Sequence, residues 1–339
     1  MEFGDALFQN VESLTYDSRY GDYRIGRVPE EVRQSLNMKA QKNILFASNC
    51  ELRFIMEEDQ VSVFLRRMPV PEQILPIGVA QVFQGDFQGS YEIDLYPVSE
   101  KESEIRIRRQ EWGHICSFAQ QGYRFHPSVT RLLLPYDWGC FISRTKGKMR
   151  LPEAGMMPEK NLLVYGSSIT HGGNASLPSH TYAFRLAETL GMDLINLGCA
   201  GSCRLDETMA MYIAGRNDWD RALFELGVNV LEEWTPEELY ERTRSFLLTV
   251  KKIHPEKPVF VTDMFYNYHD FQADSRAAAF RKAVGNCVDE LRKQFEGLYY
   301  RNGLTVMGTW RGLSSDGLHP SDKGHRMIAE KLGRWMRAD

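Results

Sequence analysis

The hydrophobic and polar positions of the chain follow two different periods. Over roughly residues 1–140, apolar and polar residues alternate, which is the period of a half-buried β-strand. Strand-like runs occur at 52–56, 61–65, 91–95, 105–108 and 131–134, with Gly, Pro and Asp residues between them. We expect the first two runs to form a hairpin around a turn at 57–60. The close, regular spacing of such runs predicts an all-β sandwich.

After about residue 150 the pattern changes to short apolar runs that alternate with longer helical stretches. A segment with Pro152, Gly155 and Pro158 separates the two patterns. Five β-then-α units predict a parallel sheet with helices on both faces, a three-layer α/β/α fold. The sequence therefore predicts two domains, a β-sandwich domain with an N-terminal extension at 1–150 and an α/β/α domain at 151–339. The expected strands are 161–165, 193–197, 221–226, 258–263 and 298–300, and the expected helices are 180–190, 207–214, 236–253, 275–294 and 322–336.

The composition and charge of the chain argue against nucleic acid and membranes as partners. The chain has 339 residues, of which 43% are hydrophobic and 25% charged, as in an ordinary globular protein. Its net charge is −4 and it has no long basic block, so nucleic acid is not an expected partner. The apolar runs fall far short of the roughly 20 residues that span a bilayer, so no membrane is expected either. The N-terminus is acidic and lacks the apolar region of a signal peptide, which predicts a cytoplasmic protein.

Polar residues and glycines collect in the loops that follow the predicted strands. In open α/β sheets, ligands bind beyond the carboxyl ends of the strands. The loops there read Gly-Ser-Ser-Ile-Thr-His-Gly-Gly at 166–173, Asn-Leu-Gly-Cys-Ala-Gly-Ser at 196–202, Gly-Val-Asn-Val at 227–230 and Asp-Gly-Leu-His-Pro at 316–320. These loops hold a hydroxyl nucleophile, N–H donors, a side-chain amide and an acid with a histidine, the groups that acyl transfer needs.

Each loop taken alone has a simpler structural interpretation. Gly-Ser-Ser is typical of a turn, and Gly201 of a tight turn or close packing. Asn229 fits a loop cap, and the spacing of Asp316 and His319 fits the entry to a helix. The combination of all four, in this order and at these strand ends, favours a catalytic site.

The same four blocks resemble those of the SGNH (GDSL) hydrolase superfamily. Block one, usually Gly-Asp-Ser, matches 166–168, and the other three blocks match Gly201, Asn229 and the pair Asp316 and His319. The resemblance covers about 161–339 and implies a flavodoxin-like α/β/α hydrolase domain. Ser167 replaces the usual Asp, and Val230 replaces the Asp that commonly follows the block-three Asn. The N-terminal part is similar to the jelly-roll-like β-sandwich domains that precede the hydrolase domain in some carbohydrate esterases and acyltransferases.

The resemblance implies a serine esterase with the catalytic triad Ser168, His319 and Asp316. The oxyanion hole would consist of the backbone amides of Ser168 and Gly201 and the side chain of Asn229. The expected substrate is a small-molecule or oligosaccharide ester, with an acetyl group on a carbohydrate as the expected acyl ester. An acyltransferase with the same triad is the alternative, and a non-catalytic carbohydrate-binding protein is the alternative from another class. The edge strands of a β-sandwich can pair with a second copy of the chain, so a homo-oligomer is a further possible partner.

Four further residues are candidates for substrate binding. His171 could line the pocket or be a turn residue, and the aromatic residues could stack on a sugar or pack against the core. These candidates are His171, Trp234, Tyr266 and Trp310. No cofactor is expected. A metal site formed by Asp316, His319 and His325 is conceivable, but the spacing makes the three side chains hard to converge, so no metal site is predicted.

Overall fold

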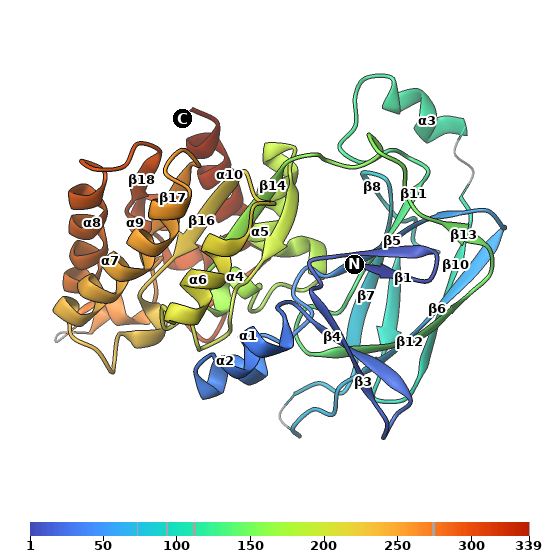
Figure 1. Cartoon of the computed structure of the whole chain (residues 1–339), viewed down its shortest axis with the longest axis horizontal. Coiled ribbons are helices and arrows are strands. Elements are labelled where there is room, and N and C mark those ends of the chain that lie inside the picture. The colour runs from blue at the N-terminus through green and yellow to red at the C-terminus, as the bar shows by residue number, and fades with distance from the viewer. Residues whose placement is uncertain (73, 93, 111–112, 273–274, 339) are drawn as a thin grey trace.

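The computed structural model describes residues 1–72, 74–92, 94–110, 113–272 and 275–338. A β-sandwich, mostly from the first half of the chain, lies beside a three-layer α/β/α unit formed by the second half (Figure 1). The predicted fold class is therefore confirmed. The domain boundary at residue 150 stays a prediction.

Two antiparallel sheets form the sandwich, and their facing apolar side chains form one core. The alternation predicted at 105–108 is confirmed, because Ile105 and Ile107 are buried while Arg106 and Arg108 are exposed. One sheet contains β1 (Glu2–Phe3), β2 (Ala6–Gln9), β5 (Glu51–Met56), β11 (Val129–Leu133), β7 (Gly78–Gln84) and β8 (Phe87–Gln88), with β13 (Met149–Arg150) on β5 and β9 (Leu95–Val98) on β7. The other contains β10 (Ser103–Arg108), β6 (Gln60–Arg67), β12 (Cys140–Lys146), β4 (Asp22–Gly26) and β3 (Ser13–Asp17).

The predicted hairpin of 52–56 and 61–65 is wrong. Both segments are strands, but β5 and β6 belong to different sheets. Their apolar side chains, such as Phe54 and Val63, meet in the core between the sheets. Alternation requires only that one face of each strand is buried, so strands that face each other satisfy it as well as strands that pair. The strand expected at 91–95 begins only at Leu95, after an exposed Tyr91, and Ile93 lies outside the described residues.

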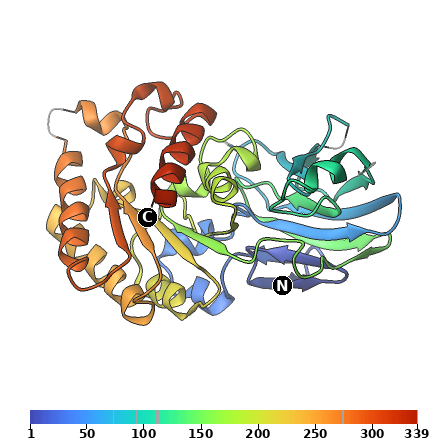
Figure 2. The ribbon, with the colours of Figure 1, turned by 90° about the horizontal axis from the view of Figure 1, so that it is seen from above.

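The second half of the chain forms a parallel sheet with helices on both faces (Figure 2). Its strand order is β15 (Asp193–Asn196), β14 (Asn161–Tyr165), β16 (Arg221–Glu225), β17 (Val259–Thr262) and β18 (Leu298–Arg301). Helices α6 (Glu207–Gly215), α7 (Pro236–Ile253) and α8 (Ala277–Leu291) cover one face, and α5 (Tyr182–Leu190) and α10 (Asp322–Ala338) cover the other. The predicted strands and helices are thus confirmed to within a few residues at their ends.

Local sequence explains where these helices begin. In α7, Pro236 occupies the first turn, the Thr235 side chain accepts a hydrogen bond from the backbone N–H of Glu238, and two glutamates follow.

The short helices and turns that complete the chain are α1 (Glu30–Gln34), α2 (Met38–Asn43), α3 (Gly113–Ala119), α4 (Ser168–His171), α9 (Gly303–Val306), η1 (Pro178–His180), η2 (Val228–Val230), η3 (Tyr268–Phe271) and η4 (Trp310–Gly312). None of the helices in the described ranges is both long and apolar enough to cross a membrane.

The sandwich and the α/β/α unit share buried contacts. Leu36, Ala40 and Ile44, in and around α2, belong to the apolar core of the α/β/α unit. On β5, the buried Arg53 donates two hydrogen bonds to Asp193 at the start of β15, with N–O distances of 2.5 and 2.7 Å. Arg53 also pairs with Glu51, and Glu51 pairs with Arg131. This ionic cluster joins the two halves of the chain where water cannot replace a missing partner.

We predict that Arg53→Met lowers the free energy of unfolding by about 3–5 kcal/mol, because it leaves two buried carboxylates without this partner. Arg106→Met is the control, since its ion pair with Glu104 is largely exposed and is worth at most about 1 kcal/mol. Urea unfolding of both variants checks the prediction. Similar losses in the two variants would contradict it.

Candidate active site

The predicted site residues follow strands that meet at one edge of the parallel sheet. The strand order reverses between β14 and β16, and this switch point is where doubly wound sheets bind ligands. Ser168 follows β14 and Asn229 follows β16, while Asp316 and His319 lie in the loop before α10. The fold thus brings together residues up to 151 positions apart in the sequence.

Ser168, His319 and Asp316 form a continuous chain of hydrogen bonds. The Ser168 Oγ lies 2.8 Å from His319 Nε2, and His319 Nδ1 lies 2.7 Å from Asp316 Oδ2. Since an ionised carboxylate only accepts hydrogen bonds, Nδ1 carries the proton and Nε2 is the acceptor for the serine hydroxyl. A serine in this arrangement can transfer its proton to the ring as it attacks.

Asp316 is held by further donors. Its Oδ1 accepts hydrogen bonds from the backbone N–H groups of Leu318 and His319, and its Oδ2 accepts one from Asn174 Nδ2 at 2.8 Å. Burial raises the pKa of this carboxyl, but the backbone N–H groups and the His319 ring outweigh burial and lower the pKa below its usual value. Asp316 is therefore ionised at neutral pH and can orient the ring of His319.

A buried carboxylate supports the turn that carries Ser168. Glu225, at the end of β16, accepts hydrogen bonds on Oε2 from the Ser167 backbone N–H at 2.8 Å, the Ser167 Oγ at 2.6 Å and the Thr170 Oγ1 at 3.1 Å. The Ser167 Oγ in turn caps α4 by accepting from the Ile169 N–H. Among the described residues, Glu225 Oε1 has no hydrogen-bond partner. Burial raises the pKa of Glu225, although the Ser167 and Thr170 hydrogen bonds oppose the shift.

The loop with Gly201 lies between the serine turn and Asn229. The Cys199 N–H donates to the Gly166 carbonyl oxygen at 2.8 Å, and the Cys203 N–H donates to Asn229 Oδ1 at 3.0 Å. Because Oδ1 is used in this way, the Nδ2 amino group of Asn229 is the end left to donate. Gly201 has a φ of +59°, a backbone conformation that other residues rarely adopt, so the position favours glycine.

Residues from the first half of the chain cover the other side of this loop. Asn43, in α2, donates from Nδ2 to the Ala200 carbonyl oxygen at 2.6 Å. The rings of Phe46 and Tyr136 lie 5.4 and 5.8 Å from the ring of His171. These contacts bury His171, which is 3% exposed, and burial lowers its pKa well below the usual value. His171 is therefore a neutral ring between the two halves of the chain.

The three predicted aromatic residues lie in different surroundings. Trp234 is 9% exposed and belongs to the apolar core on the α7 side of the sheet. Tyr266 packs against Phe271, and Trp310 is 63% exposed on η4. Their role in substrate binding, like that of His171, stays a prediction.

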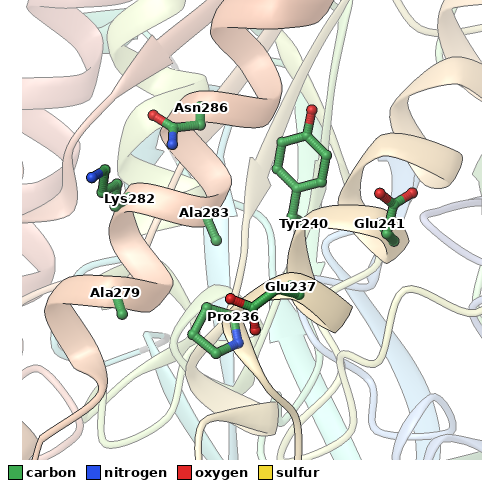
Figure 3. A pocket seen from close by; sticks show the side chains of 8 residues that line it. All are labelled: Pro236, Glu237, Tyr240, Glu241, Ala279, Lys282, Ala283 and Asn286. Carbon is green, nitrogen blue, oxygen red and sulfur yellow. The ribbon is translucent and has the colours of Figure 1, made fainter.

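His325 packs in the interior, where its Nδ1 accepts from the Tyr182 N–H and its Nε2 donates to the Gly173 carbonyl oxygen. Within the part of the chain that the structure describes, no cluster of three or more His, Cys, Asp or Glu side chains is arranged to hold a metal ion. A cavity of about 400 Å³ between α7 and α8 is lined by none of the predicted site residues (Figure 3). Its side chains come from the outer helices, so we do not assign it to this site.

Sequence reasoning missed several residues that hold the site, among them Glu225, Asn174, Asn43 and Phe46. Glu225 could have been suspected, because a charged residue that ends an apolar strand next to Gly227 is buried at a cost. Asn174 and Asn43 carry no such signal, since polar residues in loops are ordinary.

Comparisons with known proteins identify the family and the fold. The sequence model of the GDSL-like lipase/acylhydrolase family matches residues 159–337. Among curated proteins, none matches the chain. A similar solved structure is the salicylyl-acyltransferase SsfX3 from a tetracycline biosynthetic pathway, with a TM-score of 0.81, 19% identity, and coverage of 98% of this chain and 94% of that chain.

Two carbohydrate esterase structures also share the fold. A family two carbohydrate esterase from Clostridium thermocellum, in complex with cellohexaose, has a TM-score of 0.60 and 14% identity, and covers 85% of this chain and 91% of its own. An acetyl xylan esterase from the rumen bacterium Butyrivibrio proteoclasticus has a TM-score of 0.59 and 11% identity, with coverage of 99% and 96%. At these identities the similarity concerns the fold, including the sandwich.

We predict that Glu225→Gln makes stability less dependent on pH. Because burial raises the pKa of Glu225, the folded state binds its proton more tightly than the unfolded state does, and stability falls as the pH rises above the ordinary value of 4.5. Gln keeps an acceptor oxygen for Ser167 and Thr170 but cannot ionise. Urea unfolding between about pH 5 and pH 8 should show a smaller loss in the variant than in the wild type.

The matched variant Glu225→Ala removes the acceptor as well and should lose about 1–3 kcal/mol through the donors left unpaired. An unchanged pH dependence in Glu225→Gln would show that Glu225 does not titrate in this range.

Proposed function

We propose that this chain, which belongs to the GDSL-like lipase/acylhydrolase family of ester-bond hydrolases, is a serine esterase that removes small acyl groups, above all acetyl, from a carbohydrate. The observation that carries the proposal is the hydrogen-bonded chain from Ser168 through His319 to Asp316, with distances of 2.8 and 2.7 Å. The carbohydrate and the acetyl group are suggested by the fold shared with carbohydrate esterases.

In the proposed reaction, Ser168 Oγ attacks the ester carbonyl carbon while its proton passes to His319 Nε2. The carbonyl oxygen becomes an oxyanion, which accepts hydrogen bonds from the Ser168 and Gly201 backbone amides and from Asn229 Nδ2. Asp316 stabilises the imidazolium that forms. The tetrahedral intermediate collapses, the alcohol leaves with the proton from His319, and an acyl-serine remains. Water, deprotonated by His319, then attacks the acyl-serine and releases the acid and the free serine.

The alternative is an acyltransferase, in which an alcohol takes the place of water in the second half of the reaction. The fold similarity to a salicylyl-acyltransferase supports this alternative, as the fold similarity to carbohydrate esterases supports hydrolysis. Initial rates on p-nitrophenyl esters of increasing acyl length, with and without sugar acceptors, separate the two. Hydrolysis of the acetate without acceptor supports the esterase, and an acylated sugar as the main product supports the transferase. A chain that turns over no ester would be a binding protein.

Ser168→Ala is expected to abolish labelling by a fluorophosphonate probe, because the probe needs an activated hydroxyl to form its covalent bond. The exposed Ser245 of α7 provides the control, and Ser245→Ala should be labelled like the wild type. Labelling followed by mass spectrometry of the modified peptide is the measurement. Persistent labelling of Ser168→Ala would exclude Ser168 as the nucleophile.

Asn229→Ala is expected to lower kcat by on the order of 10²- to 10³-fold, with little change in KM, because it removes one donor that acts on the oxyanion. Steady-state kinetics on p-nitrophenyl acetate check this. Asn229 also anchors the Cys203 N–H, so a circular dichroism spectrum must first establish that the variant folds. A variant that folds and keeps its kcat would remove Asn229 from the oxyanion hole.

A further inference from the structure

An apolar cavity of about 480 Å³ lies at the end of α2 and is lined by residues of the first half of the chain. We propose that this cavity, which we call the ring pocket, binds an aromatic group of the ester substrate. The inference rests on the proposed cleavage of an ester at Ser168, and it adds to the substrate an aromatic group that an acetylated carbohydrate alone does not have. The residues of the ring pocket used in the argument are Asn43, Leu45, Phe46, Met68, Val70 and Trp138.

The ring pocket adjoins the catalytic loops through direct contacts. Phe46, in its wall, has its ring 5.4 Å from the ring of His171, the last residue of the helix that begins with Ser168. Asn43, at its edge, donates a hydrogen bond to the carbonyl oxygen of Ala200, the neighbour of Gly201. The ring pocket therefore lies next to the segments that carry Ser168 and Gly201.

The chemistry of the wall selects against a sugar. Apolar side chains form most of the lining, and the Asn43 amide already donates to Ala200. The Trp138 Nε1 donates to the Pro69 carbonyl oxygen at 3.2 Å, so this donor is also used. Lys42 is the charged residue of the lining, but sugar hydroxyls placed against the apolar side chains would lose their hydrogen bonds to water, which is costly. An apolar group loses nothing by the same transfer and gains from leaving water.

The shape and the partners of the ring pocket favour a planar ring. The rings of Phe46 and Trp138 are stacked, with centroids 4.6 Å apart and planes 27° apart, and present aromatic surface to the cavity. The Met68 side chain also lines the cavity, and thioethers contact aromatic rings favourably. A cavity of about 150 Å³ already holds benzene, so this volume accommodates a substituted or fused ring.

The ring could belong to the acyl group or to the alcohol of the ester, and three substrates distinguish the two. In 2-naphthyl acetate the ring is in the alcohol, in vinyl benzoate it is in the acyl group, and vinyl acetate has none. Two variants test the pocket from opposite directions. Trp138→Ala removes a wall, and Val70→Trp fills the cavity while it keeps the Val70 backbone N–H that donates to Glu100.

We expect each variant to raise KM at least about tenfold for one of the two ring-bearing esters, which corresponds to 1.4 kcal/mol, and to leave kcat unchanged. Each variant should hydrolyse vinyl acetate as the wild type does. The affected ester shows which side of the substrate carries the ring. Tyr91→Ala is the control, because Tyr91 is a 94% exposed aromatic residue that does not line the cavity. The proposal is overturned if neither variant discriminates between the ring-bearing esters and vinyl acetate.

Binding without turnover separates this inference from the proposed function. Calorimetry with 2-naphthol on Ser168→Ala should give binding that Val70→Trp, added to the same background, weakens at least about tenfold. If the wild type hydrolyses none of the three esters but 2-naphthol binds in this way, the proposed function fails and the ring pocket stands. If 2-naphthol does not bind, or binds equally well after Val70→Trp, the ring pocket is wrong whatever the activity.

Discussion

The guanidinium of Arg27 joins the two halves of the chain next to the candidate active site. Arg27 follows β4 of the sandwich, is 1% exposed, and donates to backbone carbonyl oxygens on both sides of the interface. Two of these acceptors are Asn196, which ends β15, and Gly198, in the loop that follows, at 2.8 and 2.9 Å. The others are Asn43, Ile44 and Phe46, at 3.2, 3.2 and 2.6 Å. Burial lowers the pKa of Arg27, so these carbonyl dipoles have to offset its loss of water.

The position of this one cation explains why the site draws on both halves. The carbonyls at 43–46 fix the end of α2 and the Phe46 ring, and those of Asn196 and Gly198 fix the loop that carries Gly201. A carbonyl dipole that moved away would leave part of a buried charge unsatisfied, so the two segments have one stable relative arrangement. The wall of the ring pocket and the proposed oxyanion hole are therefore positioned by the same side chain.

The sequence predicts the α/β/α half well and the joint between the halves poorly. Strands such as β14 and β16 are short apolar runs followed by glycine and polar residues, so both the element and the loop that carries the chemistry are encoded locally. Arg27 and Asn196 are 169 positions apart, and neither residue stands out in its own segment. The predicted hairpin of 52–56 and 61–65 is wrong for the same reason. Alternation indicates that one face of β5 is buried, but not which strand pairs with β5. Contacts between distant segments leave no periodic signal in a single sequence.

Ser167, which replaces the usual Asp of block one, is explained by its hydrogen bond to Glu225. Ser167 both accepts from the Ile169 N–H, as an aspartate at this position could, and donates from Oγ to the buried Glu225 at 2.6 Å. An aspartate at 167 could cap α4, but it would put a second carboxylate against Glu225. Two buried carboxylates in contact cannot both be ionised, so one would have to hold a proton beside Ser168, the proposed nucleophile. A hydroxyl avoids this conflict because it can accept and donate at once. Ser167 and Glu225 therefore form a matched pair, and a change at either position alone would disturb the turn that presents Ser168.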